Sequence, residues 1–201
     1  KIVCYSIAPW TNSVVYYDEA TKTTVKKRLT PGSEEWTTIW TAFLNDLADH
    51  LYEKGWFNDA YIGIDERGFN KAAFDLIDSI KRGIPTPLKL KSAGAMDGFV
   101  EKKDLAMRVD DLNVGSIAVK AHPQQFEEIR QAREDAGLRT TIYTCTGHKP
   151  GNFSLSAPGE SYWTMMYSYS VGGEGYLRWA YDSWVENPLE DTTHNAFEAG
   201  D

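Results

Sequence analysis

Two adjacent carboxylates, Asp65 and Glu66, are the residues whose types and positions best suit catalysis. They end an apolar segment, residues 60–65, whose alternation predicts a strand with Ile62 and Ile64 on one face. The same alternation puts Asp65 on the other face, and a loop that begins at Glu66 lets both carboxylates face one pocket. In such a pair, burial or a neighbouring charge raises one pKa toward that of a general acid, while the other carboxylate stays ionised.

A structural explanation of the same pair stays open at this point. Glu66 can pair with Arg67 or with a lysine, and Asp65 can cap the helix that follows. The residues alone do not decide between catalysis and this structural role.

Aromatic and polar side chains at other predicted strand ends are candidates for sugar binding. The chain holds 7 Trp and 11 Tyr, more flat amphipathic rings than a core alone needs, and such rings stack on sugar faces. The candidates for substrate binding are Trp10, His122, Tyr143, Trp179 and Trp184.

Each of these candidates also has a structural alternative. The pattern of residues 116–121 predicts a strand that places His122 on an interior face, where a neutral imidazole hydrogen-bonds a hydroxyl group, but capping a helix fits equally well. Tyr143 is either a hydroxyl donor or a core residue. Trp179 and Trp184 either wall a sugar or pack in the core, and Trp179 is the stronger candidate.

The elements that must position these residues alternate between strand and helix. Predicted strands cover residues 2–8, 60–65, 88–92, 116–121, 140–145 and 176–181. Predicted helices cover residues 36–51, 70–82, 102–109, 123–136 and 160–171, with Trp36, Trp40 and Phe43 in the core. This alternation favours a parallel sheet with right-handed crossovers, interrupted by a hairpin insertion at residues 14–29.

A partial (β/α)₈ barrel is the predicted architecture. The segment from Ala8 to Asn12 lacks the glycines of a dinucleotide-binding turn, which argues against that kind of open sheet. Polar and aromatic residues gather at the predicted carboxyl ends of the strands, as in barrel enzymes. A complete barrel has about 250 residues, so six units predict that two further strands precede Lys1.

Composition excludes several classes of partner. Lys and Arg number 21 against 29 Asp and Glu, and the formal charge of −8 disfavours nucleic acid. No apolar run is long enough for membrane insertion. Cys4 and Cys145 are predicted to be buried thiols, and the absence of close His and Cys spacings predicts neither a metal site nor a cofactor.

Three segments resemble one known family. They are HLYEKGWFNDAYIGIDERG at residues 50–68, YTCTGHKPGNF at 143–153 and GEGYLRWAYDSWVENP at 173–188. They resemble the catalytic domain of glycoside hydrolase family 123. The resemblance implies a (β/α)₈ barrel, of which this chain supplies strands three to eight. It also implies hydrolysis of β-linked N-acetylgalactosaminides by a retaining mechanism in which the 2-acetamido group of the sugar is the nucleophile.

The resemblance also implies a role for each of the two carboxylates. Asp65 would orient the acetamido group, and Glu66 would protonate the leaving oxygen and then activate water. Within such a site, the position of Tyr143 in a predicted strand suits donation of its hydroxyl group to the acetamido oxygen, and Trp179 and Trp184 suit the walls around the acetamido methyl group and the sugar face. The expected partner is a glycan of the mucin or glycolipid type.

Two other functions are compatible with the sequence. One is a non-catalytic carbohydrate-binding module, although such a module has no need of the adjacent carboxylates. The other is an inactive fragment of the enzyme, because we expect residues 1–201 to be one catalytic-type domain truncated at both ends, with a polar tail at 186–201. Missing strands would expose sheet edges and apolar surface, which predicts self-association or reduced stability.

Overall fold

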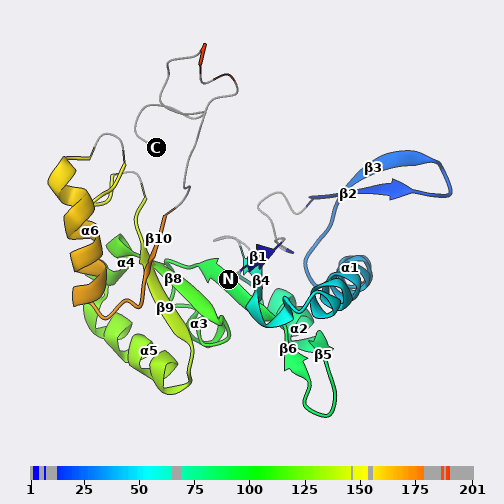
Figure 1. Cartoon of the computed structure of the whole chain (residues 1–201), viewed down its shortest axis with the longest axis horizontal. Helices are drawn as coiled ribbons and strands as arrows, with labels where there is room; N and C mark the ends of the chain where they lie inside the picture. Colours follow the sequence, from blue (N-terminus) through cyan, green and yellow to red (C-terminus); the bar gives the residue numbers. More distant parts are fainter. Residues whose placement is uncertain are drawn as a thin grey trace. The chain divides into compact units, whose positions relative to one another are not determined.

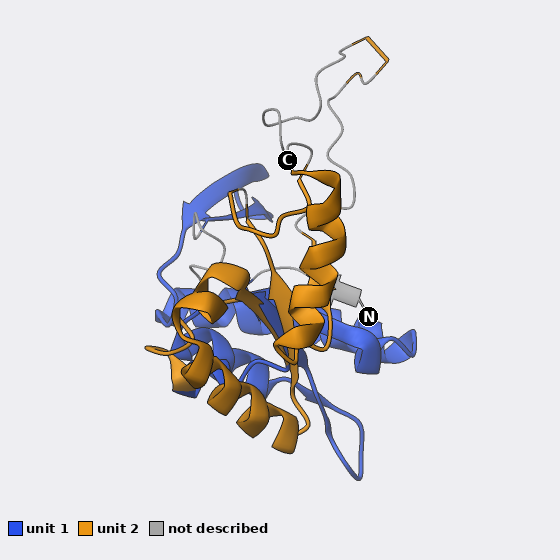
Figure 2. Ribbon diagram, turned by 90° about the vertical axis from the view of Figure 1, so that its left-hand side faces the viewer, with its two compact units in different colours: residues 1–94, 104–110 blue, residues 95–103, 111–201 orange. Residues whose placement is uncertain are grey.

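The chain is divided into two compact units. The computed structural model describes residues 2–4, 7, 13–64, 69–145, 147–153, 156–178, 187 and 189–190. Unit 1 comprises residues 1–94 and 104–110, and unit 2 comprises residues 95–103 and 111–201 (Figure 2). We describe each unit by itself.

Short strands and longer helices follow one another along the chain (Figure 1). The strands are β1 Ile2–Cys4, β2 Ser13–Asp18, β3 Thr23–Arg28, β4 Ala60–Ile64, β5 Lys81–Arg82, β6 Leu88–Lys89, β7 Lys91–Ala95, β8 Asp111–Gly115, β9 Arg139–Tyr143 and β10 Tyr176–Leu177. The α-helices are α1 Glu34–Glu53, α2 Lys71–Ser79, α3 Lys103–Ala106, α4 Ser116–Ala121, α5 Pro123–Asp135 and α6 Pro158–Ser170, and a short 3₁₀ helix covers Phe57–Asp59.

Unit 1 is built on parallel pairing of β1, β4 and β7. Val3 pairs with Tyr61, and Ile64 at the end of β4 pairs with Gly94 of β7. Two antiparallel hairpins complete the described part of this unit: β2 with β3, where the insertion was predicted, and β5 with β6.

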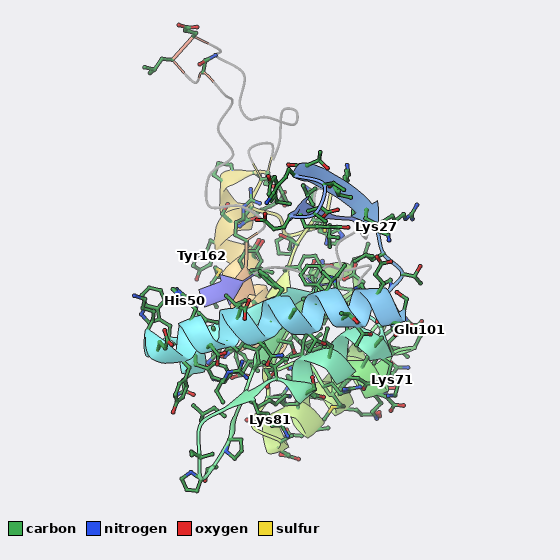
Figure 3. The ribbon with its side chains drawn as sticks, turned by 90° about the vertical axis from the view of Figure 1, so that its right-hand side faces the viewer. Lys27, His50, Lys71, Lys81, Glu101 and Tyr162 are labelled. Atoms are coloured by element: carbon green, nitrogen blue, oxygen red, sulfur yellow. The ribbon has the colours of Figure 1, made fainter. Side chains whose placement is uncertain are left out.

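The long helix α1 supplies much of the core of unit 1. The Ser33 hydroxyl caps it by accepting the Trp36 N–H at 3.2 Å, and Glu35 in its first turn pairs with Lys27 of β3 at 2.5 Å. Figure 3 labels Lys27 on the blue hairpin of β2 and β3. Trp36 and Trp40 are buried as predicted. Phe43 was predicted in the core but is 40% exposed, because it lies at the edge of the apolar stripe with its ring against Trp40.

Unit 2 is built on parallel pairing of β8, β9 and β10, with α5 packed beside β9 (Figure 1). The helix presents Phe126 and Ile129 to the core. Its fully buried Arg133 donates from Nε to the Thr140 hydroxyl at 2.9 Å, so this cation is satisfied inside the unit.

The mixed α/β class with parallel strands is confirmed, and two strand assignments need correction. Residues 116–121, predicted as a strand, form helix α4, and the strand of that region is β8, at residues 111–115. The predicted strand 88–92 divides into β6, which pairs with β5, and β7, which pairs with β4. Closure into a barrel and the strand numbering stay predictions, as do the single domain and self-association.

Several other predictions fall partly or wholly outside the described residues. The side chain of Cys4 and most of the tail 186–201 belong to this group. Cys145 is half-buried instead of buried. Among the helices that the structure describes, none is long and apolar enough to cross a membrane.

Candidate functional site

Strand β4 leads directly into the acidic pair. Ala60, Ile62 and Ile64 are buried, and the two residues between them are partly exposed. This alternation is the predicted one, so Ile62 and Ile64 do face the core. Asp65 and Glu66 lie outside the described residues, and their catalytic roles stay predictions.

Both ends of the short segment that contains the pair are held in the core of unit 1. Ile64 and Phe69, the described residues on either side, are each 4% exposed. Gly94 packs against both: a Cβ at Gly94 would lie 2.4 Å from the Ile64 carbonyl oxygen and 2.9 Å from the Phe69 ring. Only glycine fits there without moving the strand end or the ring.

The structure answers one alternative for Asp65. Helix α2 begins at Lys71, and its cap is Asn70, whose side-chain oxygen accepts the Ala73 N–H at 3.0 Å. The cap position of α2 is therefore occupied by Asn70, whereas Asp65 lies outside the described residues. The pairing of Glu66 with Arg67 lies outside the described residues.

In unit 2, a carboxylate that the sequence did not single out is fixed near the carboxyl ends of β8 and β9. Asp97 follows β7 by two residues, and its Oδ1 accepts the Gly115 N–H at 3.0 Å and the Tyr143 hydroxyl at 2.9 Å. Tyr143 is buried with 6% exposure, whereas Asp97 is exposed. The ring of Tyr143 is thus part of the core, its hydroxyl group donates to Asp97, and its contact with a substrate stays a prediction.

The two faces of β8 and β9 differ in chemistry. Gly115 pairs with Tyr143 and Asn113 with Thr141, so these four residues share one face, and the Thr141 hydroxyl donates to the Asn113 side chain. The opposite face carries Leu112, Val114, Thr140 and Ile142, where Thr140 contacts α5 through Arg133. The polar cluster therefore lies on the face that α5 does not cover.

His122 does not follow a strand, because residues 116–121, which were predicted to form that strand, form helix α4. It lies between α4 and α5, at the N-cap position of α5, without a side-chain capping hydrogen bond. Its half-buried ring lies edge-on to Phe99, with ring centroids 6.4 Å apart. An interior strand face is therefore wrong for His122, and its substrate contact stays a prediction without that support.

A second histidine, His148, is structurally engaged beyond β9. Its Nδ1 accepts the Cys145 N–H at 3.1 Å and lies 3.4 Å from the Ser116 hydroxyl. An Nδ1 that accepts a backbone proton requires the tautomer with its proton on Nε2. Ser116 is fully buried and His148 is half-buried, and this pair organises the loop after β9.

A further polar group fixes the end of β10. The Tyr176 hydroxyl group forms a hydrogen bond with the Thr144 hydroxyl group and donates to Asn152 Oδ1 at 3.0 Å. The guanidinium of Arg178 lies over the Phe153 ring, with its Cζ 4.4 Å from the ring centroid. Burial raises the pKa of Tyr176, so its hydroxyl stays protonated at neutral pH. Trp179, which follows at once, lies outside the described residues, as do Trp10 and Trp184.

Metal ligation finds no support in this part of the chain. Among the described residues, no three His, Cys, Asp or Glu side chains are grouped so that they could hold an ion.

Parallel strands alternating with helices, with polar groups at the carboxyl ends of β8 and β9, define this protein as a mixed α/β protein. The family model described as "Glycoside hydrolase 123, catalytic domain" matches residues 1–201. The chain belongs to this family.

One solved structure extends the comparison. The chain is similar, at 40% identity and a TM-score of 0.86, to a family 123 glycoside hydrolase from Clostridium perfringens whose structural analysis concerns glycolipid glycan hydrolysis. The match covers 100% of this chain and 35% of that one, so the chain spans about a third of its relative. Among curated proteins, none matches.

Proposed function

We propose that this chain carries the catalytic carboxylates of a glycoside hydrolase that releases β-linked N-acetylgalactosamine by a retaining, substrate-assisted mechanism. The observation that carries the proposal is the family match over residues 1–201, which includes Asp65 and Glu66 directly after β4. Because the similar Clostridium perfringens enzyme is described for glycolipid glycans, we propose the glycan part of a glycolipid as the substrate class.

In the first step, the 2-acetamido oxygen of the sugar attacks its anomeric carbon. The bond from that carbon to the glycosidic oxygen breaks, and Glu66 gives its proton to the leaving oxygen. The sugar becomes an oxazolinium-like ion. Asp65, still ionised, holds the acetamido nitrogen and balances the positive charge that develops on the ring.

In the second step, water attacks the anomeric carbon from the side that the leaving group has vacated. Glu66, now a carboxylate, takes the proton of this water, and the bond to the acetamido oxygen breaks. Two inversions at one carbon return the β configuration, and both carboxylates return to their starting states.

The experiment measures hydrolysis of an aryl β-N-acetylgalactosaminide by the full chain, with NMR detection of the anomer released first. We expect the β anomer, and we expect the corresponding aryl β-galactoside to be essentially inert because its 2-hydroxyl group cannot form the cyclic intermediate. An α product, or comparable turnover of the galactoside, would overturn the mechanism.

The same assay separates hydrolysis from simple binding. Calorimetry with N-acetylgalactosamine tests the alternative of a non-catalytic binding module, for which the sugar binds and no aryl alcohol is released. The variant in which both Asp65→Asn and Glu66→Gln are present is the matched negative control, since it keeps the shape of the pair and removes its charge.

A further inference from the structure

Asp97 is held by two hydrogen bonds that fix only one of its oxygens. Oδ1 accepts the Gly115 N–H at 3.0 Å and the Tyr143 hydroxyl at 2.9 Å. Hydrogen bonds to a carboxylate are stronger than those between neutral groups, so this side chain has one preferred orientation. The turn after β7 is thereby tied to β8 and β9.

The backbone of β8 leaves room for the carboxylate. A Cβ at Gly115 would lie 2.2 Å from Asp97 Oδ1, a distance that real Cβ atoms essentially never show. The close approach therefore requires glycine, and any side chain at this position would displace Asp97.

The second oxygen of Asp97 is not used within the described part of the chain. Asp97 is exposed, and among the described residues its Oδ2 has neither a hydrogen-bond donor nor a cationic partner. Half-buried Glu160, by contrast, pairs with Lys149 at 2.8 Å. Within the described ranges of the chain, Asp97 is thus an oriented acceptor without a counter-ion.

We propose that Asp97 is a further substrate-binding residue, whose Oδ2 accepts a hydrogen bond from a hydroxyl group of the sugar. This inference rests on the proposed function, which supplies a ligand rich in hydroxyl donors. A carboxylate without a counter-ion accepts such donors and repels an anion, so the position takes a neutral sugar in preference to a carboxylated or sulfated one. Asp97 therefore contributes to specificity.

The test uses Asp97→Asn in the full chain, with the 3-, 4- and 6-deoxy analogues of the aryl β-N-acetylgalactosaminide. We expect Asp97→Asn to lower kcat/KM on the parent substrate by about 10- to 100-fold, the factor for a hydrogen bond to a charged group. The unsubstituted protein should lose a similar factor on one deoxy analogue. Asp97→Asn should lose a much smaller factor of kcat/KM on that same analogue, because the substitution has already weakened the hydrogen bond with the missing hydroxyl group.

Two further variants test how Asp97 is held. Gly115→Ala keeps the carboxylate and moves it, so it should reproduce the loss caused by Asp97→Asn. Tyr143→Phe removes one of the two anchors and should cause a smaller loss that does not add to that of Asp97→Asn. Thermal unfolding of each variant separates these effects from unfolding.

Glu174→Gln is the matched control. Glu174 is also exposed and also accepts a backbone N–H, that of Thr140 at 3.0 Å, but it lies at the amino ends of β9 and β10. We expect its kinetics to equal those of the unsubstituted protein on every substrate.

The role of Asp97 is wrong if Asp97→Asn loses the same factor of kcat/KM on all the analogues, or if it loses nothing on the parent substrate. If no substrate is cleaved, calorimetry with N-acetylgalactosamine decides: weaker binding by Asp97→Asn supports the inference while the proposed function fails. If the unsubstituted protein does not bind the sugar either, both are wrong.

Discussion

Glu66 and Asp65 have different tasks in the proposed reaction, so substitutions that preserve their shapes should have different effects. Glu66→Gln removes the proton donor, and Asp65→Asn removes the charge that holds the acetamido group. With a poor leaving group we expect each to lower kcat by about 100- to 10,000-fold, the range for positioned acid–base groups. With an activated phenol, which leaves without protonation, Glu66→Gln should recover much of its first step and Asp65→Asn should not.

Single-turnover rates on a series of aryl substrates provide this measurement. The dependence of the rate on the pKa of the leaving phenol should become steeper in Glu66→Gln and stay close to that of the unsubstituted protein in Asp65→Asn. Equal slopes in the two variants would show that the assigned division of tasks is wrong.

The hydroxyl group of Tyr143 is constrained by its single proton. While this proton is donated to Asp97 Oδ1, the phenolic oxygen can only accept a hydrogen bond from a ligand. The predicted donation from Tyr143 to the acetamido oxygen requires the O–H to turn away from Asp97. The substrate contact of Tyr143 stays a prediction, and its described contact is the one that orients Asp97.

The contact between β4 and β7 is the feature that positions the segment after β4. Gly94→Ala would place a Cβ within 2.4 Å of the Ile64 carbonyl oxygen, with backbone on one side and the buried Phe69 ring on the other. We expect a loss of about 1–3 kcal/mol in the free energy of unfolding, as for other overpacked sites. We also expect lower kcat/KM, because Ile64 and Phe69 are the described residues on either side of the proposed catalytic pair.

Gly159→Ala is the control for this substitution. Gly159 lies in the first turn of α6, and a Cβ there would meet nothing within 4 Å. Since alanine favours a helix more than glycine does, this variant should be as stable as the unsubstituted protein or slightly more so. Urea unfolding followed by circular dichroism compares the two, and equal stability of both variants would contradict the packing argument.

The elements that the sequence predicts best are those whose own side chains specify them. Helix α1 has a serine cap and a regular apolar stripe, and α5 has an N-terminal proline, so both were predicted nearly to their ends. Strand β8 was missed because Asp111, Asn113 and Gly115 disfavour a strand in isolation. Asn113 is satisfied by Thr141 of β9, a tertiary contact that the local sequence does not reveal.

The error at residues 116–121 has a similar origin. Ile117 and Val119 alternate with smaller or polar residues and so imitate a strand, but in α4 Val119 is buried and Ile117 is exposed. The Asp97 cluster was missed for a different reason: Asp97 lies 18 residues from Gly115 and 46 from Tyr143. Only the pairing of strands brings these groups together, whereas Asp65 and Glu66 are adjacent in the sequence and were found.

For the molecule as a whole, acidic groups outnumber basic ones, and several of the carboxylates depend on ion pairs. Hydrogen bonds from Lys71 and Arg108 lower the pKa of Asp75. Burial alone would raise the pKa of Asp78, but hydrogen bonds from Arg108 and Lys89 outweigh it and lower the pKa. In unit 2, hydrogen bonds from Lys149 and from the Gly151 N–H lower the pKa of Glu160.

These shifts determine how stability depends on pH. A carboxylate whose pKa is lower in the folded state stabilises the fold at pH values above its unfolded pKa, here close to the ordinary value of 3.8 for Asp. This contribution is lost as the pH falls through the folded pKa. The protein should therefore keep its full ion-pair stability at neutral pH and lose it below about pH 4.

Arg108→Met tests this dependence on pH at a cation that pairs with two of these carboxylates. Arg108 bonds to Asp78 at 2.7 Å and to Asp75 at 2.9 Å, and its side chain also stacks on Phe74, a contact that methionine largely keeps. We expect the variant to be less stable at pH 7 by roughly 1 kcal/mol, the range for partly exposed pairs. The difference should shrink toward zero as Asp75 and Asp78 become protonated.

Lys81→Met is the control, because exposed Lys81 has no ion-pair partner among the described residues and its removal changes the net charge equally. Urea unfolding from pH 7 to pH 3 measures both variants, and a difference for Arg108→Met that stays constant over this range would show that packing, not charge, is responsible for its contribution.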